Sequence, residues 1–507
     1  MKFLENRIRV VLTSEGTYPY VTGGVSTWTH VLIGELTEID FTLLPIKMNP
    51  FLKIKFPLPK NVVDMITVPL WGILDPSEFT KETAFSVVYK EKIRSRDEIS
   101  QKKFIPILNI IIDYIYGIKD DFEYLGDVLV DFHDYFNNYD YHEIFTSQEI
   151  WEAYKTKMGL IYKDCEDNIP TVLDLVEGLR FLYRFFITLL APIKEAEIYH
   201  SSAAAFCGLP CILAKKKFGS KFLLTEHGIY IREQYLFSSR ELVPYRTKEF
   251  LMGLITLVSK LNYVYADIIS PVCDYNKRWE VQWGAKDEQL RTIYNGIDTD
   301  VFKPMKRQTK DDRPTVVMLA RIDQLKDIET YIHTCKLVSK EIPDVMFKLF
   351  GNTVDATYYK KCENLVKKLE IENNFSFEGV TNNPAWAFNQ GDVVMLTSIS
   401  EAFPFVVIEA MSCEKIVVSS DVGGTTEVLE GYGFVAKPKA YREFADYTID
   451  ILNNLESYRE MEIQARQRVL NGFTIIDMID NYRDCYEELF EQYNKENPKT
   501  YDRTKKI

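Results

Sequence analysis

The chain has 507 residues, of which 46% are hydrophobic and 27% are charged. This composition is that of a folded protein with room for two or three domains. The 61 basic and 74 acidic side chains give a formal net charge of −13, which disfavours a dedicated nucleic-acid-binding protein because such a protein needs a basic surface. The eight cysteines include no CxxC pair, so neither a zinc ribbon nor a disulfide framework is indicated.

The N-terminal residues are charged as far as Arg9 and lack the apolar segment of a signal peptide. The longest apolar stretch, Leu179–Ile193, contains two arginines. It is also shorter than the roughly 18–20 residues that cross a bilayer. We therefore expect no transmembrane segment and a cytoplasmic protein, with a peripheral position at the cytoplasmic membrane face as the alternative.

Residues 8–45 are predicted to form a strand, a helix and a second strand. Ile8–Leu12 is rich in β-forming residues and is followed by a turn-rich loop over 14–24. Val25–Leu36 is apolar at helical spacing, and Phe41–Pro45 is predicted to be the next strand. This βαβ opening is typical of one half of a nucleotide-binding fold.

Residues 50–195 differ in character, because they are aromatic and acidic and show helical periodicity. We expect a helical insertion in the first domain, with helices over Ile105–Ile118, Ile150–Tyr162 and Val172–Leu190. Short apolar strands then return at Ile198–His200, Phe222–Thr225 and Ile268–Ser270.

A second series of strands and helices begins near Pro314. The expected strands are Thr315–Leu319, Met346–Phe350, Phe375–Phe377, Val393–Leu396, Ile416–Ser419 and Phe434–Ala436. The expected helices are Ile328–Ser339, Tyr358–Leu369, Phe405–Met411, Tyr441–Leu455 and Met478–Tyr493. Apolar strands alternating with amphipathic helices predict a parallel sheet covered on both faces.

The predicted fold class is therefore α/β, with two Rossmann-like, doubly wound domains facing a cleft. We place the N-terminal, acceptor-binding domain at 1–300, with the helical insertion at about 50–195. The C-terminal, donor-binding domain is placed at 301–475. A C-terminal helix and tail over 476–507 are expected to pack back on the N-terminal domain.

The strongest local pattern is Ser400–Met411, which follows the predicted strand Val393–Leu396. Pro404 suits the first turn of a helix, and the free N–H groups of such a turn can bind an anion or sugar hydroxyls. Glu401 and Glu409 could then accept hydrogen bonds from a sugar and a ribose. The alternative is a Glu401 that only complements the helix dipole and a solvated Glu409.

Two further helix starts carry residues suited to phosphate binding. Arg321 and Lys326 lie between a predicted strand and a helix, where a diphosphate could bind, although basic residues are common in such loops. Gly23 and Gly24 open the first predicted helix, where glycine lets the backbone approach a phosphate. The full GxGxxG spacing of a dinucleotide site is absent.

His200 and His227 each follow a short apolar strand, so each is either a functional group at the edge of the sheet or a satisfied structural histidine. The triplet Asp298-Thr299-Asp300 has the form of a metal-binding DxD motif. It lies in a turn-rich stretch, and we interpret it as interdomain linker. No metal site is predicted.

Together these motifs resemble the GT4 family of retaining glycosyltransferases, which have the two-domain GT-B fold. The matching residues in chain order are Gly23-Gly24, Asn295–Pro304, Arg321, Lys326, Glu401, Glu409 and Asp421–Gly424. Two further segments, Glu15–Ser26 and Thr225–Glu233, are similar to the PelF branch, whose members act in Pel exopolysaccharide synthesis. The resemblance covers nearly the whole chain.

The resemblance implies roles for individual residues. Arg321 and Lys326 would bind the donor diphosphate and stabilise the leaving group. Glu409 would hold the ribose, and Glu401 and the active-site histidine His200 would lie beside the transferred sugar. Further implied donor-binding residues are Gly23, Gly24, Phe403, Phe405 and Val406. Implied acceptor-side or supporting residues are Glu15, His227 and Arg232.

The implied activity is retaining transfer of a hexose, glucose from UDP-glucose, onto a polysaccharide or glycoconjugate. No metal or other cofactor is implied. The alternatives are GDP-mannose or another donor acting on a lipid-linked glycan, or a non-catalytic sugar-nucleotide-binding subunit of a membrane polysaccharide export complex. The expected partners are a nucleotide sugar, a glycan acceptor and an inner-membrane polysaccharide-synthesis protein, and no nucleic acid.

Overall fold

The computed structural model describes residues 7–73, 83–165, 167, 169–239, 243–307 and 312–498. The chain forms two compact units. The first unit comprises the chain up to Pro271, Trp279–Arg291 and the chain from Tyr482 onward, and the second unit comprises Val272–Arg278 and Thr292–Asn481. Among the described residues, no helix is both long and apolar enough to cross a bilayer.

The first unit is built on a parallel sheet with the strand order β3-β2-β1-β5-β6-β7, and β4 also pairs with β2. Its strands are β1 (Arg9–Glu15), β2 (Asp40–Lys47), β3 (Val62–Met65), β4 (Val68–Pro69), β5 (Ile198–Ser201), β6 (Lys221–Glu226) and β7 (Ile268–Pro271). The order reverses between β1 and β5. In open α/β sheets this switch point is where ligands bind, outside the carboxyl ends of the strands.

Strands β3 and β4 lie inside the stretch 50–195 that was expected to be a helical insertion, so this part of the prediction was wrong. Val62 and Asp64 continue the sheet beside Phe41 and Thr42 of β2. The runs are only four and two residues long. Such short runs carry no readable periodicity, which explains why the sequence pattern did not reveal them. In the described residues the helical part begins with α3.

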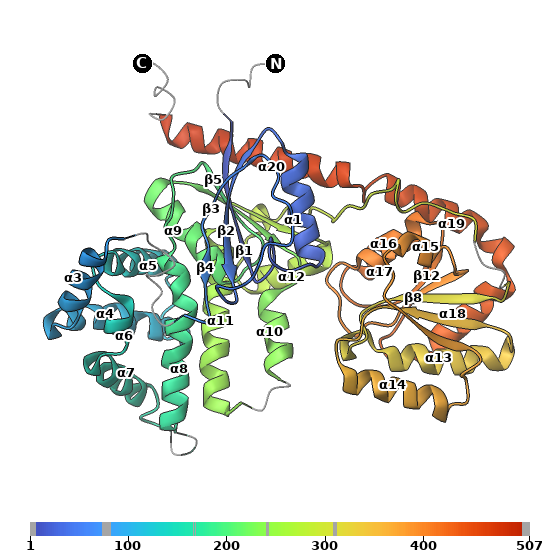
Figure 1. Cartoon of the computed structure of the whole chain (residues 1–507), viewed down its shortest axis with the longest axis horizontal. Coiled ribbons are helices and arrows are strands. Elements are labelled where there is room, and N and C mark those ends of the chain that lie inside the picture. The colour runs from blue at the N-terminus through green and yellow to red at the C-terminus, as the bar shows by residue number, and fades with distance from the viewer. Residues whose placement is uncertain are drawn as a thin grey trace. The chain divides into compact units, whose positions relative to one another are not determined.

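The insertion and the crossover connections supply most helices of the first unit (Figure 1). They are α1 (Gly24–Glu35), α3 (Phe85–Ser95), α4 (Glu98–Ile115), α5 (Phe122–Phe136), α6 (Tyr141–Phe145), α7 (Gln148–Ile161), α8 (Val172–Phe185), the 3-10 turns η1 (Phe186–Leu190) and η2 (Phe206–Gly208), α9 (Leu209–Phe218), α10 (Tyr230–Ser238) and α11 (Tyr245–Tyr265). Helices α4, α7 and α8 confirm the three that were expected in the insertion, whereas α3 and α5 were not foreseen.

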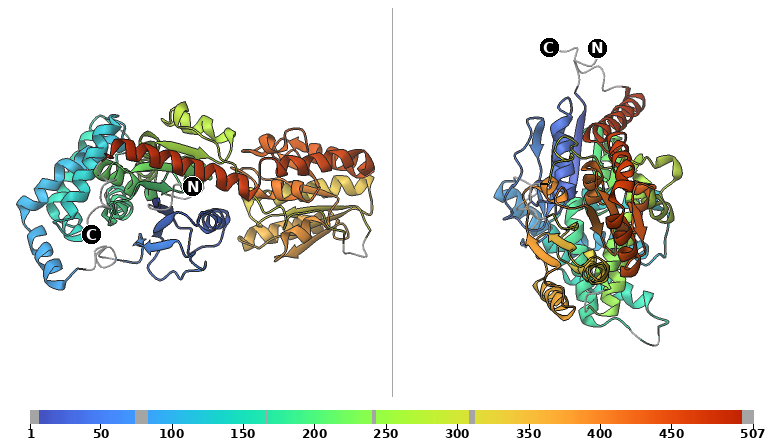
Figure 2. Two further views of the ribbon diagram at one scale, coloured as in Figure 1. Left: turned by 90° about the horizontal axis from the view of Figure 1, so that it is seen from above. Right: turned by 90° about the vertical axis from the view of Figure 1, so that its right-hand side faces the viewer.

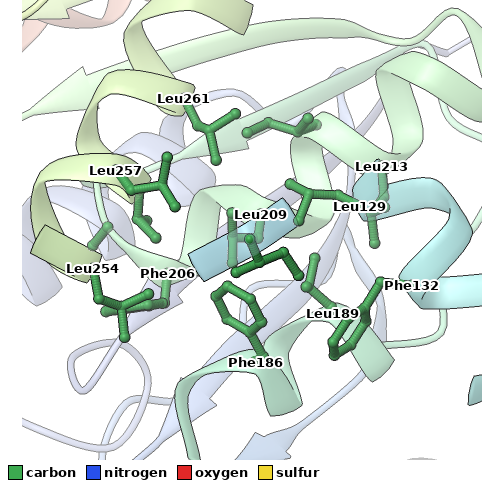
Figure 3. Close-up of a cluster of buried hydrophobic side chains, with 14 of the residues drawn as sticks. Leu129, Phe132, Phe186, Leu189, Phe206, Leu209, Leu213, Leu254, Leu257 and Leu261 are labelled. Atoms are coloured by element: carbon green, nitrogen blue, oxygen red, sulfur yellow. The ribbon is translucent and has the colours of Figure 1, made fainter. Parts of the chain in front are cut away.

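One apolar core joins the insertion to the sheet of the first unit. Figure 3 shows buried side chains from five elements meeting there, namely Leu129, Phe132, Phe186, Leu189, Phe206, Leu209, Leu213, Leu254, Leu257 and Leu261. Burial of leucine and phenylalanine side chains stabilises a core by roughly 1.5–3 kcal/mol each. The insertion is therefore an integral part of the first unit.

The opposite face of this sheet is covered by α1 and by the end of α20 (Ile475–Glu496). The ring of Trp28 lies 5.5 Å from that of Tyr482, and the ring of Phe41 lies 6.2 Å from that of Tyr486. Figures 1 and 2 show this part of α20 running along the elements of the first unit.

The second unit contains a parallel sheet with the order β10-β9-β8-β11-β12-β13. Its strands are β8 (Thr315–Leu319), β9 (Met346–Phe350), β10 (Phe375–Gly379), β11 (Val393–Leu396), β12 (Ile416–Ser420) and β13 (Phe434–Ala436). Its helices are the 3-10 turn η4 (Gln324–Lys326), α13 (Ile328–Glu341), α14 (Ala356–Lys368), α15 (Pro384–Phe388), α16 (Phe405–Ser412), α17 (Thr425–Leu429), α18 (Tyr441–Asn453) and α19 (Leu455–Leu470). Here the order reverses between β8 and β11.

Both faces of the second sheet are covered, as its continuous apolar strands predict (Figure 1). Along β8, Val316 and Met318 pack into a core with α13, α14 and α18, while Val317 and Leu319 pack into another with α15, α16, α17 and α19. All the strands expected in this unit are present. Helix α19 was not foreseen.

The chain enters the second unit before the boundary expected at residue 301. Ile297 donates its N–H to Phe473 O at 3.0 Å and accepts from the N–H of Ile475 at 3.1 Å. The Glu427 carboxylate accepts from the N–H groups of Asp274 and Tyr275 at 3.0 and 3.2 Å, at the start of α12 (Asp274–Gln282). These bonds make both crossing segments part of the second unit.

Candidate functional site

The switch point of the second unit joins the loops that follow β8 and β11. The Thr397 hydroxyl lies 3.0 Å from Lys326 O and 2.9 Å from Asp327 O. The N–H of Ile399 donates to Leu325 O at 2.8 Å. The segment that leads to Glu401 is thereby fixed against the segment that carries Lys326.

The position of Lys326 follows from a short turn. The Asp323 side chain accepts hydrogen bonds from the N–H groups of Leu325 and Lys326, at 2.9 and 3.2 Å. Asp327 then adopts a left-handed conformation with φ of 47° and caps α13 by accepting from the N–H of Thr330. Both aspartates satisfy N–H groups that a helix start leaves without acceptors. The lysine is thus held on a constrained backbone.

Lys326 forms an ion pair with Glu401, and Nζ lies 2.5 Å from Oε1. The two side chains are 20% and 14% exposed, whereas the nearby Arg321 is 60% exposed. Arg321 contacts only the carboxylate of Asp323, at 3.4 Å, among its salt-bridge partners in the described chain. The edge of the sheet therefore presents an accessible guanidinium beside a largely covered ion pair, which is a suitable arrangement for binding an anion.

Glu409 lies on α16, the helix that follows the Glu401 loop. Burial raises the pKa of its carboxyl to about 7. Within the described residues, no hydrogen bond or ion pair involves its side-chain oxygens. Because an ionised carboxylate without partners is costly inside a protein, this group is suited to accept hydrogen bonds from a ligand.

The start of α16 has backbone N–H groups that a ligand could use and a side chain that is buried in the core. The N–H groups of Phe405 and Val406 belong to the first turn, where a helix offers them no acceptor. The ring of Phe403 is only 6% exposed and packs 5.9 Å from that of Phe473. Phe403 therefore contributes a core side chain, and only backbone groups of this segment are suited to donor binding.

A glycine loop after β12 packs against the backbone of Glu401 and Ala402. Gly423 has φ of 58°, and a Cβ atom there would lie 2.2 Å from Glu401 O. The N–H of Gly424 donates to Ala402 O at 2.7 Å. A side chain at Gly423 would displace the backbone of Glu401, and a Cβ atom at Gly424 would lie 2.8 Å from Cβ of Cys273, so both positions favour glycine.

The DxD triplet has a local role. The Asp298 carboxylate accepts from the N–H groups of Asp300 and Val301, at 2.9 and 3.1 Å, and so closes a turn of its own. Such a turn is typical of a linker. No group of three or more potential metal ligands occurs among the residues that the structure describes.

At the switch point of the first unit, Glu15 ends β1 and points toward η2. Its carboxylate accepts from the N–H of Cys207 at 3.2 Å, and burial raises its pKa to about 7. Gly23 caps α1 with an extended backbone, and a Cβ atom there would meet nothing within 4 Å. Gly23 and Gly24 do open the helix as expected. Packing alone does not require the first of them to be glycine.

The expectation that His200 contacts the sugar is not consistent with the structure. His200 is completely buried, and burial lowers the pKa of its ring to about 3. Its Nδ1 lies 2.6 Å from the hydroxyl of Tyr486, and its Nε2 lies 2.9 Å from the hydroxyl of Thr225. Both ring nitrogens are therefore engaged inside the protein, and the neutral ring serves as a structural link between β5, β6 and α20.

His227 differs from His200, because one of its ring nitrogens lacks a hydrogen-bond partner among the described residues. It is half-buried after β6, and the edge of its ring meets Trp28, with the ring centroids 4.5 Å apart. Its Nε2 is buried and has no hydrogen-bond partner within the described part of the chain, and burial lowers the pKa of the ring to about 3. A neutral imidazole with a free nitrogen can bind a hydroxyl. Arg232 lies close by, in the first turn of α10.

Sequence reasoning missed the group that anchors the His227 loop. Glu226, the residue before it, is fully buried and accepts from the hydroxyl of Tyr263 at 2.7 Å and from the N–H of Tyr230 at 3.0 Å. Burial raises the pKa of Glu226. The signal that could have identified it is an acidic residue at the end of an otherwise apolar strand.

Two family models match the chain. The model described as "Domain of unknown function (DUF3492)" matches residues 8–288, and the model described as "Glycosyl transferases group 1" matches residues 301–468. The second match contains Arg321, Lys326, Glu401 and Glu409.

The chain is also similar to curated glycosyltransferases. It is 26% identical over 212 residues to N-acetyl-alpha-D-glucosaminyl L-malate synthase of Bacillus anthracis, which covers 40% of this chain and 55% of that protein. It is 28% identical over 197 residues to trehalose synthase of Thermococcus litoralis, covering 37% and 47%. The chain thus spans about half the length of these relatives.

Solved structures share the fold. Sucrose-phosphate synthase of Thermosynechococcus elongatus has a TM-score of 0.60 at 18% identity, with 96% of this chain and all of that chain covered. Anabaena HepE in complex with UDP-glucose has a TM-score of 0.55 at 12% identity, with 95% and 100% covered. The expected class of two Rossmann-like α/β domains, as in GT-B glycosyltransferases, is therefore confirmed.

Proposed function

Since the chain belongs to the DUF3492 family and carries a group 1 glycosyltransferase domain, we propose that it transfers a hexose from UDP-glucose to a glycan acceptor. The observation that carries the proposal is the Lys326–Glu401 ion pair beside the exposed Arg321, at the switch point of the second sheet. An α/β sheet binds its ligand at this place.

The donor site is assigned from the chemistry of these groups. Arg321 and Lys326 bind the two phosphates, and the amides at the start of α16 add uncharged donors. Glu409 accepts the ribose hydroxyls, because its carboxylate has no other partner among the described residues. Glu401 faces the transferred sugar and keeps Lys326 in place until the diphosphate binds.

The reaction that these groups serve is the exchange of one bond for another at the anomeric carbon. The acceptor oxygen forms the new bond as the bond to the diphosphate oxygen breaks, and the proton of the acceptor passes to the departing diphosphate. With retention of configuration, both events occur on the same face of the sugar. Arg321 and Lys326 stabilise the negative charge that develops on the leaving group. Positioning of the acceptor next to the anomeric carbon supplies the remaining part of the rate enhancement.

Support for UDP-glucose comes from similarity of fold to HepE, which was solved with that donor bound. We assign the acceptor to the first unit, where Nε2 of His227 is buried without a hydrogen-bond partner among the described residues and would gain one from an acceptor hydroxyl. A role in exopolysaccharide synthesis of the PelF type, beside an inner-membrane partner, rests on the sequence motifs of the first unit. Independence from metal is part of the same proposal.

The test is calorimetric titration of the full chain with UDP, GDP and ADP, with and without added Mg²⁺. We expect UDP to bind most tightly and without metal. The double variant Arg321→Ala, Lys326→Ala should lose about 100-fold or more in affinity, since two charge-assisted contacts are removed. UDP release from UDP-glucose should fall in parallel.

The matched control is the double variant Arg442→Ala, Lys368→Ala, which removes the same two residue types from exposed helical positions of the same unit. It should bind UDP like the unmodified protein. Tighter binding of GDP would favour the GDP-mannose alternative. If no nucleotide binds, or both double variants bind equally well, the donor site is wrongly assigned and a non-catalytic role is favoured.

A further inference from the structure

A groove of about 560 Å³ lies in the first unit, far in sequence from the donor-site residues. It follows one face of α11, whose residues Tyr245, Lys248, Glu249, Met252, Gly253, Thr256, Leu257 and Lys260 recur at helical spacing along it. The end of α4, the start of α5 and the end of α10 form its other walls. We call it the α11 groove. Its volume is in the range that accommodates small organic ligands.

The floor of the α11 groove is apolar. Ile115, Met252 and Leu257 line it and are buried. Leu257 also belongs to the core that joins the insertion to the sheet (Figure 3). At Gly253, a Cβ atom would lie 2.5 Å from Ile115 O, so this glycine permits the close approach of α4 and α11. The shape of the floor is thus set by well-packed residues.

Several polar groups of the lining are already engaged in the protein. The hydroxyl of Ser239 donates to Leu236 O at 2.8 Å, and that of Tyr114 donates to Asp121 O at 2.5 Å. The hydroxyl of Ser238 donates to the carbonyl of Tyr235 at 3.2 Å. Each of these hydroxyls has donated its only proton to a protein carbonyl and can only accept from a ligand, whereas a sugar needs donors and acceptors in its site. A hydrocarbon chain makes no such demand.

Lysines lie along the α11 groove. Lys119, Lys248 and Lys260 have no carboxylate within 4.0 Å among the described residues, although Lys260 lies 5.7 Å from the ring of Trp283. The lining also contains Glu249, which accepts from Arg246 at 2.7 Å, and the exposed Asp120. The lysines outnumber the uncompensated carboxylates, on a chain whose net charge is −13. This local excess of positive charge favours an anionic ligand.

Aromatic side chains flank the same lysines. Tyr235 and Tyr245 belong to the lining and are 47% and 67% exposed. Phe237, 61% exposed, lies on the same helix as Tyr235. Tyrosine side chains combine an apolar ring with a polar tip and are favoured where apolar and aqueous surroundings meet. An apolar floor with lysines and tyrosines around it is the pattern expected for a ligand that has both a chain and a charged head.

We propose that the α11 groove binds an anionic amphiphile, with its hydrocarbon chain along α11 and its phosphate head at Lys119 and Lys248. The shared chemistry is that of a membrane phospholipid and of a soluble or extracted lipid phosphate. The proposal does not depend on the transfer reaction, because no residue of the groove belongs to the donor site.

The probe is decyl phosphate, titrated calorimetrically into the full chain below its micellar concentration. Inorganic phosphate and decyl maltoside serve as the head alone and as a neutral amphiphile, and both should bind at least about tenfold more weakly. The double variant Lys119→Glu, Lys248→Glu should weaken decyl phosphate binding about tenfold or more. Thr256→Trp, which fills the groove without changing its charge, should have a similar effect.

The matched control is Lys103→Glu, Lys367→Glu, which reverses two exposed lysines outside the groove and should leave binding unchanged. UDP affinity and circular dichroism report whether each variant is folded. Sedimentation with phosphatidylcholine vesicles, with and without phosphatidic acid, distinguishes the sources of the ligand. Binding to the acidic vesicles identifies a membrane lipid, and binding to decyl phosphate alone identifies a soluble lipid phosphate. The proposal is overturned if decyl phosphate does not bind, if decyl maltoside binds equally well, or if folded groove variants bind like the control.

Discussion

The two sheets have the same strand order, yet their switch points present their polar groups in opposite ways. In the second unit, Arg321 is exposed and the Lys326–Glu401 pair lies at the edge of the sheet. In the first unit, His200 is enclosed by Tyr486 and Thr225. Topology places a polar residue at the end of a strand, but the helices packed above it decide whether that residue can reach a ligand.

The largest effect on stability is expected at Gly423, where the backbone at the switch point of the second unit is most crowded. Gly423→Ala should lower the free energy of unfolding by about 4 kcal/mol, because its Cβ would overlap Glu401 O. Gly431 also has a positive φ, of 87°, but open space around it. Gly431→Ala should therefore cost only about 1 kcal/mol. Denaturant unfolding and UDP titration measure both. Equal costs would mean that conformation alone, without the contact, sets the requirement for glycine.

Replacing His200 should mainly affect stability, whereas replacing His227 should mainly affect the transfer reaction. His200→Ala leaves the hydroxyls of Tyr486 and Thr225 without their partner and should lower the free energy of unfolding by about 3 kcal/mol. His227→Ala should change it by less than about 1 kcal/mol while slowing transfer about tenfold or more. Unfolding curves and turnover of folded protein provide the two readouts. The reverse pattern would restore His200 as the residue beside the sugar.

Glu409 should couple pH to stability. Its pKa is raised to about 7 from an ordinary value of 4.5, so the folded state binds the proton more tightly than the unfolded state does. Stability contributed by this group is therefore lost as pH rises from 4.5 to 7 and stays lost above. Glu409→Gln should stabilise the protein by about 2 kcal/mol at pH 8 and hardly at all at pH 4.

The same variant should bind UDP more weakly at pH 8, because the amide replaces a carboxylate acceptor. Thermal unfolding across pH, with and without UDP, measures both effects. A Glu409→Gln protein whose stability gain is the same at both pH values would show that the carboxyl does not titrate in this range.

The smallest effect is expected from a single hydroxyl. Tyr486→Phe removes the partner of His200 Nδ1 but keeps the ring, so it should lower the free energy of unfolding by about 1 kcal/mol. Tyr447→Phe is the control, because no hydrogen bond of the Tyr447 hydroxyl occurs in the described structure, and it should be neutral within about 0.5 kcal/mol. A neutral Tyr486→Phe would indicate that Thr225 alone holds the imidazole.

Much of the fold could be predicted from periodicity, and the exceptions have physical causes. The six strands of the second unit were foreseen because most of them are short apolar runs between helical patterns. Strands β3 and β4 are too short to show a pattern. The bounds of helix α11 could not be predicted, because it is buried over much of its surface and so lacks a clear amphipathic period.

The residues that we propose for the donor site could be selected from the sequence, because their charges and the spacing of the glycines can be read from it directly. The roles of the histidines could not be predicted in this way. His200 lies inside β5 whereas His227 directly follows β6, and the ring contacts of His200 with Tyr482 and Tyr486 depend on α20. Those residues lie more than 250 positions further along the chain, so local sequence holds no sign of the difference.

The chain passes from one unit to the other four times, after Pro271, Arg278, Arg291 and Asn481. Neither unit is therefore a module that recombination could exchange at a single junction, as happens with domains connected by one linker. A gene fragment for residues 301–475 would omit Asp274 and Tyr294 and would leave the Glu427 carboxylate without these two hydrogen-bond partners. In this lineage a change of donor is then expected to arise by substitution at the site rather than by replacement of a whole unit.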